Sequence, residues 1–305
     1  MNQINQRLSV VASALTNDAR EAPRLSRELG FAGLLLDAYA PSLSLPDLSQ
    51  SGRRELRHIM ASQAQTLVGV QVDLGSKGFA LGADLDRLLS RVDQAIEASI
   101  ALGAGVICMD LGSLPEPQDT PRPKPSVTPE QAGLIILPTS SDIAKSQPST
   151  TTPASQPPDP QLVSHVDGAL TALGEMADRY RATVAFSSSL AGFAAVDRAI
   201  GAARCPWFGI DLDPVALLRD RWVSDEIFSR LGPLIRHVRA RDAVVGADRR
   251  TKPVEVGRGN VNWPDLLGSL DEAAYAGWMT IDPIELSDRR HAAEGALERL
   301  KPIMR

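Results

Sequence analysis

The stretch LGAGVICMD (102–110) passes from the end of a helix-like pattern into a short apolar run that stops on an aspartate. LGFAGLLLD (29–37) and YAGWMTID (275–282) repeat this arrangement near the two ends of the chain. A short apolar run between a glycine and a polar residue is typical of a strand buried in a parallel sheet. The three stretches therefore predict one repeating strand-and-helix unit that extends over the whole chain.

Eight such units can be placed along the sequence. The predicted strands span 7–13, 32–37, 66–73, 105–110, 182–187, 207–213, 234–241 and 278–282. The predicted helices span 17–30, 46–65, 83–103, 161–180, 191–203, 223–232, 263–275 and 287–302. Alternation of strands and helices predicts parallel pairing with right-handed crossovers, and eight units predict a (β/α)8 TIM barrel. A doubly wound open sheet is the competing architecture, but no G-x-G-x-x-G follows the first strand.

One segment interrupts this α/β pattern between the fourth strand and the fourth helix. Residues 114–160 carry 12 of the 22 prolines, together with many serines and threonines. This composition predicts a disordered insertion, because such a segment cannot bury enough apolar surface to order itself. Its role has two interpretations, a lid over the barrel and a tolerated insertion without function. We therefore expect one domain, 1–305, interrupted by 114–160.

Composition and charge narrow the functional class. The formal net charge of −5 argues against a general surface for nucleic acid. The N-terminal residues lack a basic segment followed by a long apolar one, and no run of eighteen apolar residues occurs, so we expect neither a signal peptide nor a membrane span. Cys108 and Cys205 are expected to be reduced cysteines of a cytoplasmic protein.

Five of the eight predicted strands end in aspartate, at positions 37, 73, 110, 213 and 282. In a barrel these carboxylates gather at the C-terminal mouth, where the active sites of this fold lie. The alternative is that each one caps a turn or a helix, which is a common role for aspartate after a strand. We favour the capping role for Asp37, Asp73 and Asp110 taken singly, and a functional role for Asp213 and Asp282.

The stretch GIDLDP (209–214) places a further carboxylate, Asp211, two residues before Asp213 in one strand. Residues i and i+2 of a strand point to the same side, so Asp211 and Asp213 share a face. Two such carboxylates repel each other unless a cation, a proton or a hydrogen-bond network lies between them. Arg239 and Arg241 alternate inward on the next strand, which predicts that guanidinium groups balance the carboxylates.

Three segments in the last third of the chain are similar to a known family. RHVRARDA (236–243), VEVGRGNVNWPDLL (254–267) and YAGWMTIDP (275–283) occur in that order. The chain resembles the xylose isomerase-like TIM barrels, the sugar phosphate isomerase/epimerase group. That family usually shows a His-x-Lys-Asp strand, a Gly-x-Gly-x-x-x-Trp turn and Gly-Tyr-x-Gly before the last strand. The matching residues here are Gly257, Gly259, Trp263, Tyr275 and Gly277.

The resemblance implies a divalent metal such as Mn²⁺, Mg²⁺ or Zn²⁺, held by Glu, Asp, His and Glu on the last four strands. The corresponding positions here are Ser187, Asp213, Arg239 and Asp282. Serine is a weak neutral ligand, and arginine offers no lone pair and stays protonated. We therefore expect a degenerate site that holds no metal. The lysine of the family motif falls on Arg241.

These residues leave three interpretations of the mouth: a structural ion-pair cluster, a site for an anionic or sugar-like ligand, and an unusual metal site. The candidate catalytic residues are Asp213, Asp282 and Arg239, and the candidate substrate-binding residues are Arg241, Ser187, Arg258, Asp110 and Asp73.

Two functions follow from these interpretations. The first is a sugar or sugar-phosphate isomerase or epimerase with an altered site and no metal. The alternative is a non-catalytic descendant that binds a ligand or acts as a scaffold. Metal-dependent endonuclease action, also found on this fold, would need a His and Glu cluster and a basic surface. We expect a small carbohydrate as the ligand and no nucleic-acid or membrane partner; the sequence leaves homo-oligomerisation open.

Overall fold

The eight predicted strands form a closed parallel barrel. A computed structural model describes residues 7–304 except 76, 113, 116–158, 188–191, 221–223 and 247–249. In hydrogen-bonding order the barrel strands are β1 (Arg7–Val11), β12 (Trp278–Ile281), β9 (Ile235–Ala240), β8 (Phe208–Leu212), β7 (Val184–Ser187), β6 (Val106–Asp110), β5 (Thr66–Val72) and β2 (Gly33–Asp37). The first and last strands pair in parallel, Ser9 opposite Thr280, so the barrel closes as the sequence predicts.

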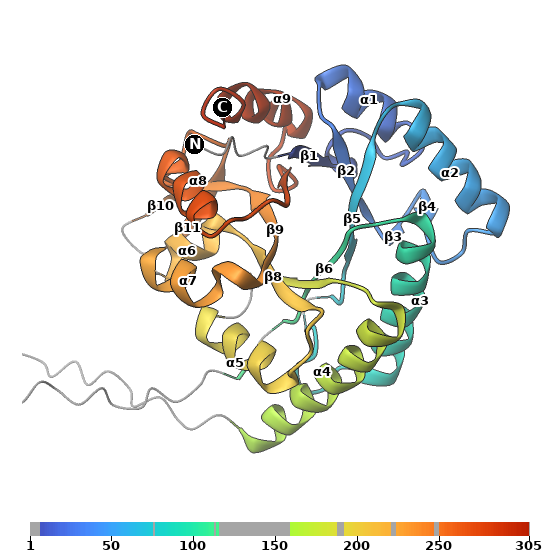
Figure 1. Cartoon of the computed structure of the whole chain (residues 1–305), viewed down its shortest axis with the longest axis vertical. Helices are drawn as coiled ribbons and strands as arrows, with labels where there is room; N and C mark the ends of the chain where they lie inside the picture. The colour runs from blue at the N-terminus through green and yellow to red at the C-terminus, as the bar shows by residue number, and fades with distance from the viewer. Residues whose placement is uncertain are drawn as a thin grey trace, which may run out of the picture.

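Helices surround the barrel (Figure 1). They are α1 (Ala22–Leu29), α2 (Gln50–Ser62), α3 (Leu85–Leu102), α4 (Pro160–Tyr180), α5 (Phe193–Ala203), α6 (Pro214–Asp220), α7 (Ser224–Leu231), α8 (Trp263–Glu272) and α9 (Arg289–Leu300). The caps of α3 illustrate how these helices begin and end. The Asp84 side chain accepts a hydrogen bond from the amide of Arg87, and Gly103 ends the helix in the left-handed region.

The sequence predicts the first two helices too long. Helix α1 begins at residue 22 because Asp18 accepts a hydrogen bond from the amide of Arg20 and holds the preceding residues in a turn. Helix α2 begins after Ser49, whose hydroxyl accepts from the amide of Gly52. Helix α4 begins at Pro160, where Asp159 is the N-cap. Residues 116–158 of the predicted insertion lie outside the described part of the chain.

The structure contains short elements that the sequence does not reveal. One 3-10 helix, η3 (Gly232–Leu234), precedes β9 at the N-terminal end of the barrel. Another, η1 (Ala12–Ala14), follows β1 at the mouth, where the elements named next also lie. One hairpin pairs β3 (Tyr39–Ala40) with β4 (Leu43–Ser44), and another pairs β10 (Asp242–Val245) with β11 (Thr251–Val254). Helix α6 follows β8 directly and packs against β10. These elements add the walls of the mouth.

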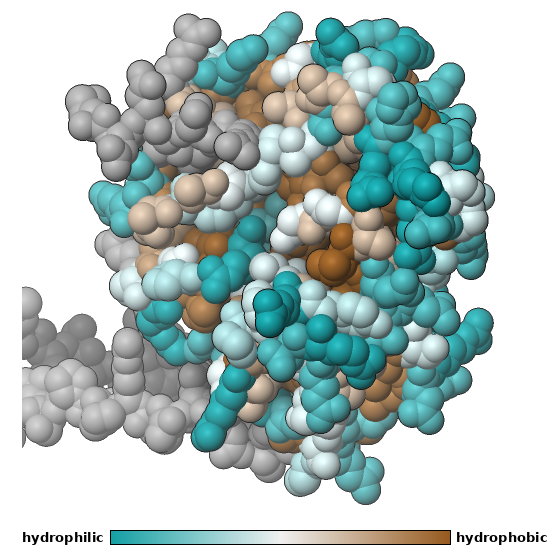
Figure 2. Space-filling view, turned by 45° about the vertical axis from the view of Figure 1, so that its right-hand side comes forward, coloured by the Kyte–Doolittle hydropathy of each residue, from teal (hydrophilic) through white to brown (hydrophobic). Residues whose placement is uncertain are grey.

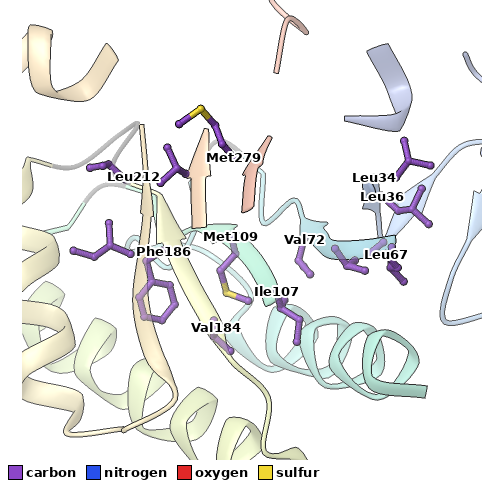
Figure 3. Close-up of a cluster of buried hydrophobic side chains, with 14 of the residues drawn as sticks. Leu34, Leu36, Leu67, Val72, Ile107, Met109, Val184, Phe186, Leu212 and Met279 are labelled. Atoms are coloured by element: carbon purple, nitrogen blue, oxygen red, sulfur yellow. The ribbon is translucent and has the colours of Figure 1, made fainter. Parts of the chain in front are cut away.

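The apolar core has two parts. The larger one lies between barrel and helices, where outward-facing side chains of the strands meet helix side chains; Figure 3 shows Leu34, Leu36, Ile107, Met109, Val184 and Phe186 in this layer. The smaller one lies inside the barrel and is built by Val11, Leu35, Val106, Cys108 and Ala185. Figure 2 shows apolar side chains in the hollows of an otherwise largely polar surface. Among the described residues, no helix is long and apolar enough to cross a membrane.

Candidate functional site

The inside of the barrel is polar where β8, β9 and β12 meet. Arg239 lies at the centre of this region, and its side chain is only 10% exposed. Its Nε donates to Asp211 Oδ2 at 2.6 Å, and its Nη1 donates to Asp282 Oδ2 at 2.7 Å. A third bond joins Nη2 to the side-chain oxygen of Gln71 on β5. The guanidinium therefore crosses the barrel and ties β9 to β5, β8 and β12.

A chain of hydrogen bonds continues from Asp211 into the barrel. His237 Nδ1 lies 2.7 Å from Asp211 Oδ1, and His237 Nε2 lies 2.6 Å from Thr280 Oγ1. The Thr280 hydroxyl in turn lies 2.7 Å from the hydroxyl of Ser9. All four residues are buried, and each hydrogen-bonds at least one of the others. This chain fixes Asp211 beneath Arg239.

A second ion-pair network lies on the rim, two residues further along β9. Arg241 Nη1 donates to Asp213 Oδ2 at 2.8 Å, and Arg241 Nη2 lies 2.5 Å from Glu285 Oε1. Asp213 also accepts from the amide of Val215. The guanidinium groups that the sequence predicts beside Asp211 and Asp213 are thus present, and each carboxylate pairs with a different arginine.

The two aspartates of the GIDLDP stretch have opposite pKa shifts. Burial alone would raise the pKa of Asp211, but Arg239 and His237 outweigh it and hold this pKa well below its ordinary value. Burial raises the pKa of Asp213, and the nearby Arg241 offsets only part of that effect. Burial likewise raises the pKa of Asp37 and of Asp110. Asp211 is therefore a permanent anion, whereas the other three bind protons more readily.

Asp242, at the start of β10, organises the turn that follows β11. Its two oxygens accept hydrogen bonds from the amides of residues 243, 257, 259 and 261 and from the indole of Trp263. Gly259 is needed here because a Cβ would lie 2.1 Å from Asp242 Oδ1. The Gly-x-Gly-x-x-x-Trp pattern thus encodes a turn wrapped around one buried carboxylate, which fixes the chain directly after Arg241.

Two cavities open beside this polar centre. The first, of about 520 Å³, lies over the ends of β1 and β2 and is lined by residues that include Ser13, Thr16, Asn17, Asp37 and Ser42. The second, of about 340 Å³, lies between α6 and the β10–β11 hairpin and is lined by residues that include Asp213, Arg219, Arg241, Thr251 and Glu285. The first cavity offers hydroxyl and amide groups with one carboxylate, and the second offers two guanidinium groups together with three carboxylates.

The structure brings some of the predicted site residues together and separates others. Ser187 is buried at the end of β7, and the register places it beside Asp110 on β6. Asp110 accepts from the amide of Gly112, and exposed Asp73 accepts from the amide of Gly75, so both do the turn-capping work that the sequence allows. Arg258 is 63% exposed and pairs with Glu255 in the turn after β11, and it lines neither cavity.

Other residues of the site do not stand out in the sequence. Gln71 and Arg219 have no motif around them, and only the closed barrel brings Gln71 to Arg239. Glu285 follows the last strand by four residues, where a loop acid is unremarkable. His237 is two residues before Arg239 on β9, so the alternation of side chains along a strand points both into the barrel and indicates that His237 can reach Asp211.

A divalent metal does not fit the residues at the family's ligand positions. The carboxylates of Asp213 and Asp282 are each bonded to a guanidinium, and the permanently charged Arg239 stands where the resemblance implies a histidine ligand. A second set of donors, from Cys108, Asp211 and His237, lies within 4.8 Å in the buried barrel. Burial raises the pKa of Cys108 well above its usual value, which favours the thiol, and the Asp211 oxygens already hold His237 and Arg239.

The chain is similar to one protein family model and to solved structures of the same fold. Residues 158–303 match the family model described as xylose isomerase-like TIM barrel. No curated protein matches the chain. A xylose isomerase domain protein from Planctomyces limnophilus superposes with a TM-score of 0.71 at 15% identity, over 98% of this chain and 96% of the other.

Two further solved structures share the whole fold. D-psicose 3-epimerase with D-tagatose, from Clostridium cellulolyticum H10, superposes with a TM-score of 0.67 at 12% identity, over 98% of this chain and 99% of the other. A xylose isomerase-like TIM barrel protein from Mycobacterium smegmatis, in complex with magnesium, gives 0.67 at 15% identity, over 100% and 98%. The family model covers the polar strands β8, β9 and β12, and the solved structures cover the complete barrel. Residues 158–303 are thus similar to the xylose isomerase-like TIM barrel family, and the whole chain shares the fold of these solved structures.

Proposed function

We propose that this chain is a carbohydrate isomerase- or epimerase-like protein in which Arg239 replaces a divalent metal. The observation that carries the proposal is the position of this guanidinium, bonded to Asp211 and Asp282 inside the barrel. In a sugar isomerase or epimerase the cation stabilises negative charge on the oxygens beside the reacting carbon. A guanidinium can supply that charge without a metal.

The cavity over β1 and β2 supports a carbohydrate as the ligand. Its volume of about 520 Å³ is sufficient for a small sugar. Hydroxyl and amide side chains such as Ser13, Thr16 and Asn17 line it, and groups of this kind hydrogen-bond the hydroxyls of a polyol. Asp37 lies in its wall, and its carboxyl group is within electrostatic range of Asp282 and Arg239.

The proposed chemistry moves a proton at the carbon next to a carbonyl group. A carboxylate removes this proton, the electron pair passes to the carbonyl oxygen, and N–H groups of Arg239 stabilise the resulting enediolate. In epimerisation the proton returns to the opposite face of the same carbon. In isomerisation it returns to the former carbonyl carbon, while the proton of the neighbouring hydroxyl moves to the former carbonyl oxygen. Asp37 and Asp213 are candidates for the base, because burial raises the pKa of each. Asp282 holds Arg239 in position.

A specific observation also favours the non-catalytic alternative. Arg239 is bonded on three sides by side chains of the barrel itself, and Ser187 occupies a position where the family has an acid–base glutamate. A barrel closed in this way can bind a ligand without converting it. The two candidates differ in one measurable event, which is exchange of a carbon-bound proton with solvent.

The test follows that proton by NMR. The protein is incubated in D₂O with a panel of ketoses and aldoses, with a chelator present. Deuterium at the carbon beside the carbonyl, lost in Arg239→Lys and Asp37→Asn and retained in the exposed control Asp47→Asn, supports the proposal. Binding without exchange would favour the non-catalytic descendant, and exchange that stops with chelator would disprove the replacement of the metal.

A further inference from the structure

The cavity between α6 and the β10–β11 hairpin differs chemically from the cavity that faces Asp37. The volume of this cavity is about 340 Å³. Its lining includes Arg219, in the last turn of α6, and Arg241, directly after β9. The hydroxyl-bearing side chain of Thr251 on β11 lines it as well. Two guanidinium groups and a hydroxyl around one small cavity form a set of donors suited to oxygen anions.

The two carboxylates on Arg241 are not equivalent. Asp213 is 3% exposed and is fixed by the amide of Val215, so it is the permanent partner of Arg241. Glu285 is 52% exposed and belongs to the loop after β12. An ion pair with so exposed a partner is worth only about 0.2–1 kcal/mol, because water solvates the carboxylate well once it is released. Glu285 is therefore an exchangeable occupant of Arg241.

The local charges permit this exchange. With Glu285 turned outward, Arg219 and Arg241 face the cavity together with Asp213 and Asp242. The carboxylate of Asp242 is stabilised by four amides and the Trp263 indole, which all donate to it. Asp213 is occupied by Arg241 itself. An incoming anion thus meets Arg241, which keeps Asp213 as its buried partner, and Arg219 in the wall of the same cavity.

We propose that this cavity is an oxyanion subsite, in which a phosphate ester or a carboxylate of the ligand displaces Glu285 from Arg241 and contacts Arg219. The inference rests on the proposed function in one respect, because it assigns the oxyanion to one end of a carbohydrate. It implies that a sugar phosphate or a sugar acid binds more tightly than the neutral sugar.

The test measures binding and requires no turnover. Inorganic phosphate, glucose 6-phosphate, gluconate and glucose are titrated calorimetrically into the full chain at constant ionic strength. We expect phosphate and at least one of the two anionic sugars to bind, and glucose to bind at least tenfold more weakly than that sugar. Preference for glucose 6-phosphate identifies a phosphate ester as the group, and preference for gluconate identifies a carboxylate.

Variants separate this subsite from general charge effects. Glu285→Gln removes the competing carboxylate and should tighten phosphate binding about two- to fivefold. Glu294→Gln is the matched control, since it removes the same charge from a similarly exposed ion pair on α9 and should change nothing. Arg219→Gln should weaken binding roughly tenfold or more, because it deletes a charged hydrogen bond.

The outcomes also separate this inference from the proposed function. Absence of phosphate binding at millimolar concentration, or equal affinities of the Glu285→Gln and Glu294→Gln proteins, would overturn the subsite. Oxyanion binding with the predicted variant effects but without proton exchange would leave the subsite standing and reject the catalytic proposal. Proton exchange on a neutral sugar without oxyanion binding would support the catalytic proposal and reject the subsite. Glu285→Gln changes an exposed side chain, so its result does not depend on whether Arg219→Gln folds.

Discussion

Arg239, near the end of β9, and Arg241, directly after it, are two residues apart in the chain, yet their surroundings differ. Arg239 lies inside the barrel between the carboxylates of Asp211 and Asp282. Arg241 lies at the rim, where one partner, Asp213, is buried and the other, Glu285, is largely in water. The deeper arginine cannot leave its partners without stranding buried charge, whereas the outer one can exchange a partner at little cost.

This contrast indicates that the two arginines have different roles. The cost of removing a buried pair makes the position of Arg239 rigid, as a substitute for a fixed cation requires. The low cost of releasing Glu285 makes Arg241 suited to recognition, because a binding group must accept a new partner. The following experiments either break this contrast or sharpen it.

The largest effect is expected from Arg239→Met, which keeps most of the side-chain volume and removes the charge. Asp211 and Asp282 would then remain buried without their cation, so the free energy of unfolding should fall by about 3–5 kcal/mol. Arg241→Met should cost about 2 kcal/mol, since it removes one charged hydrogen bond to a buried partner. Urea denaturation measures both; equal losses would remove the distinction between the two arginines.

A substitution next to Arg241 tests how the rim is held. Gly259→Ala would place a Cβ 2.1 Å from Asp242 Oδ1 and 2.6 Å from the Ala243 carbonyl, so the turn around Asp242 must shift. We expect a loss of about 2–3 kcal/mol in the free energy of unfolding. Gly268→Ala in α8 is the control, because its Cβ would meet nothing within 4 Å, and it should be neutral or stabilising. If Gly259→Ala proves as stable as the control, Asp242 does not organise this turn.

The pairing of aspartates and arginines at the barrel end can be predicted from the sequence. The parity of Asp211 and Asp213 against Arg239 and Arg241 predicts charge pairing across β8 and β9, because alternation in strands and adjacency in a barrel are regular. The same regularity predicts the eight strands and their closure. Motif order in the last third predicts the family.

The remainder depends on contacts that only the closed structure creates. Gln71 is 168 residues from Arg239 in the chain and meets it across the barrel. Asp242 collects five donors because α8 and the preceding turn fold back over it. Helix α6 and the β10–β11 hairpin are short, and short elements have too few residues to show a period. Arg219 and Glu285 become neighbours of Arg241 through these elements.

The pH dependence of stability should separate the two networks by sign. The depressed pKa of Asp211 contributes stability that is present above the unfolded carboxyl pKa of about 3.9 and is lost as the pH falls below it. The raised pKa of Asp213 acts in the opposite direction, so its contribution is lost as the pH rises from about 4 through the folded pKa. Urea titrations of Asp213→Asn should therefore show a smaller loss between pH 4 and 7 than the unmodified chain. An unchanged slope would contradict the raised pKa of Asp213.

The smallest effect is expected at Arg258, which the family-like turn suggests as a substrate contact. Its side chain is 63% exposed, and its Nε lies 3.0 Å from Glu255 Oε2, which Arg299 also holds at 2.9 Å. Because Glu255 keeps Arg299 and water replaces the lost contact, Arg258→Ala should change the free energy of unfolding by less than about 0.5 kcal/mol. Phosphate affinity, measured by the same calorimetry, should stay within twofold of the unmodified chain, in contrast to Arg219→Gln. A tenfold loss in Arg258→Ala would instead move the anion contact from the α6 cavity to the turn after β11, and the distinction between the two β9 arginines would no longer describe where the ligand binds.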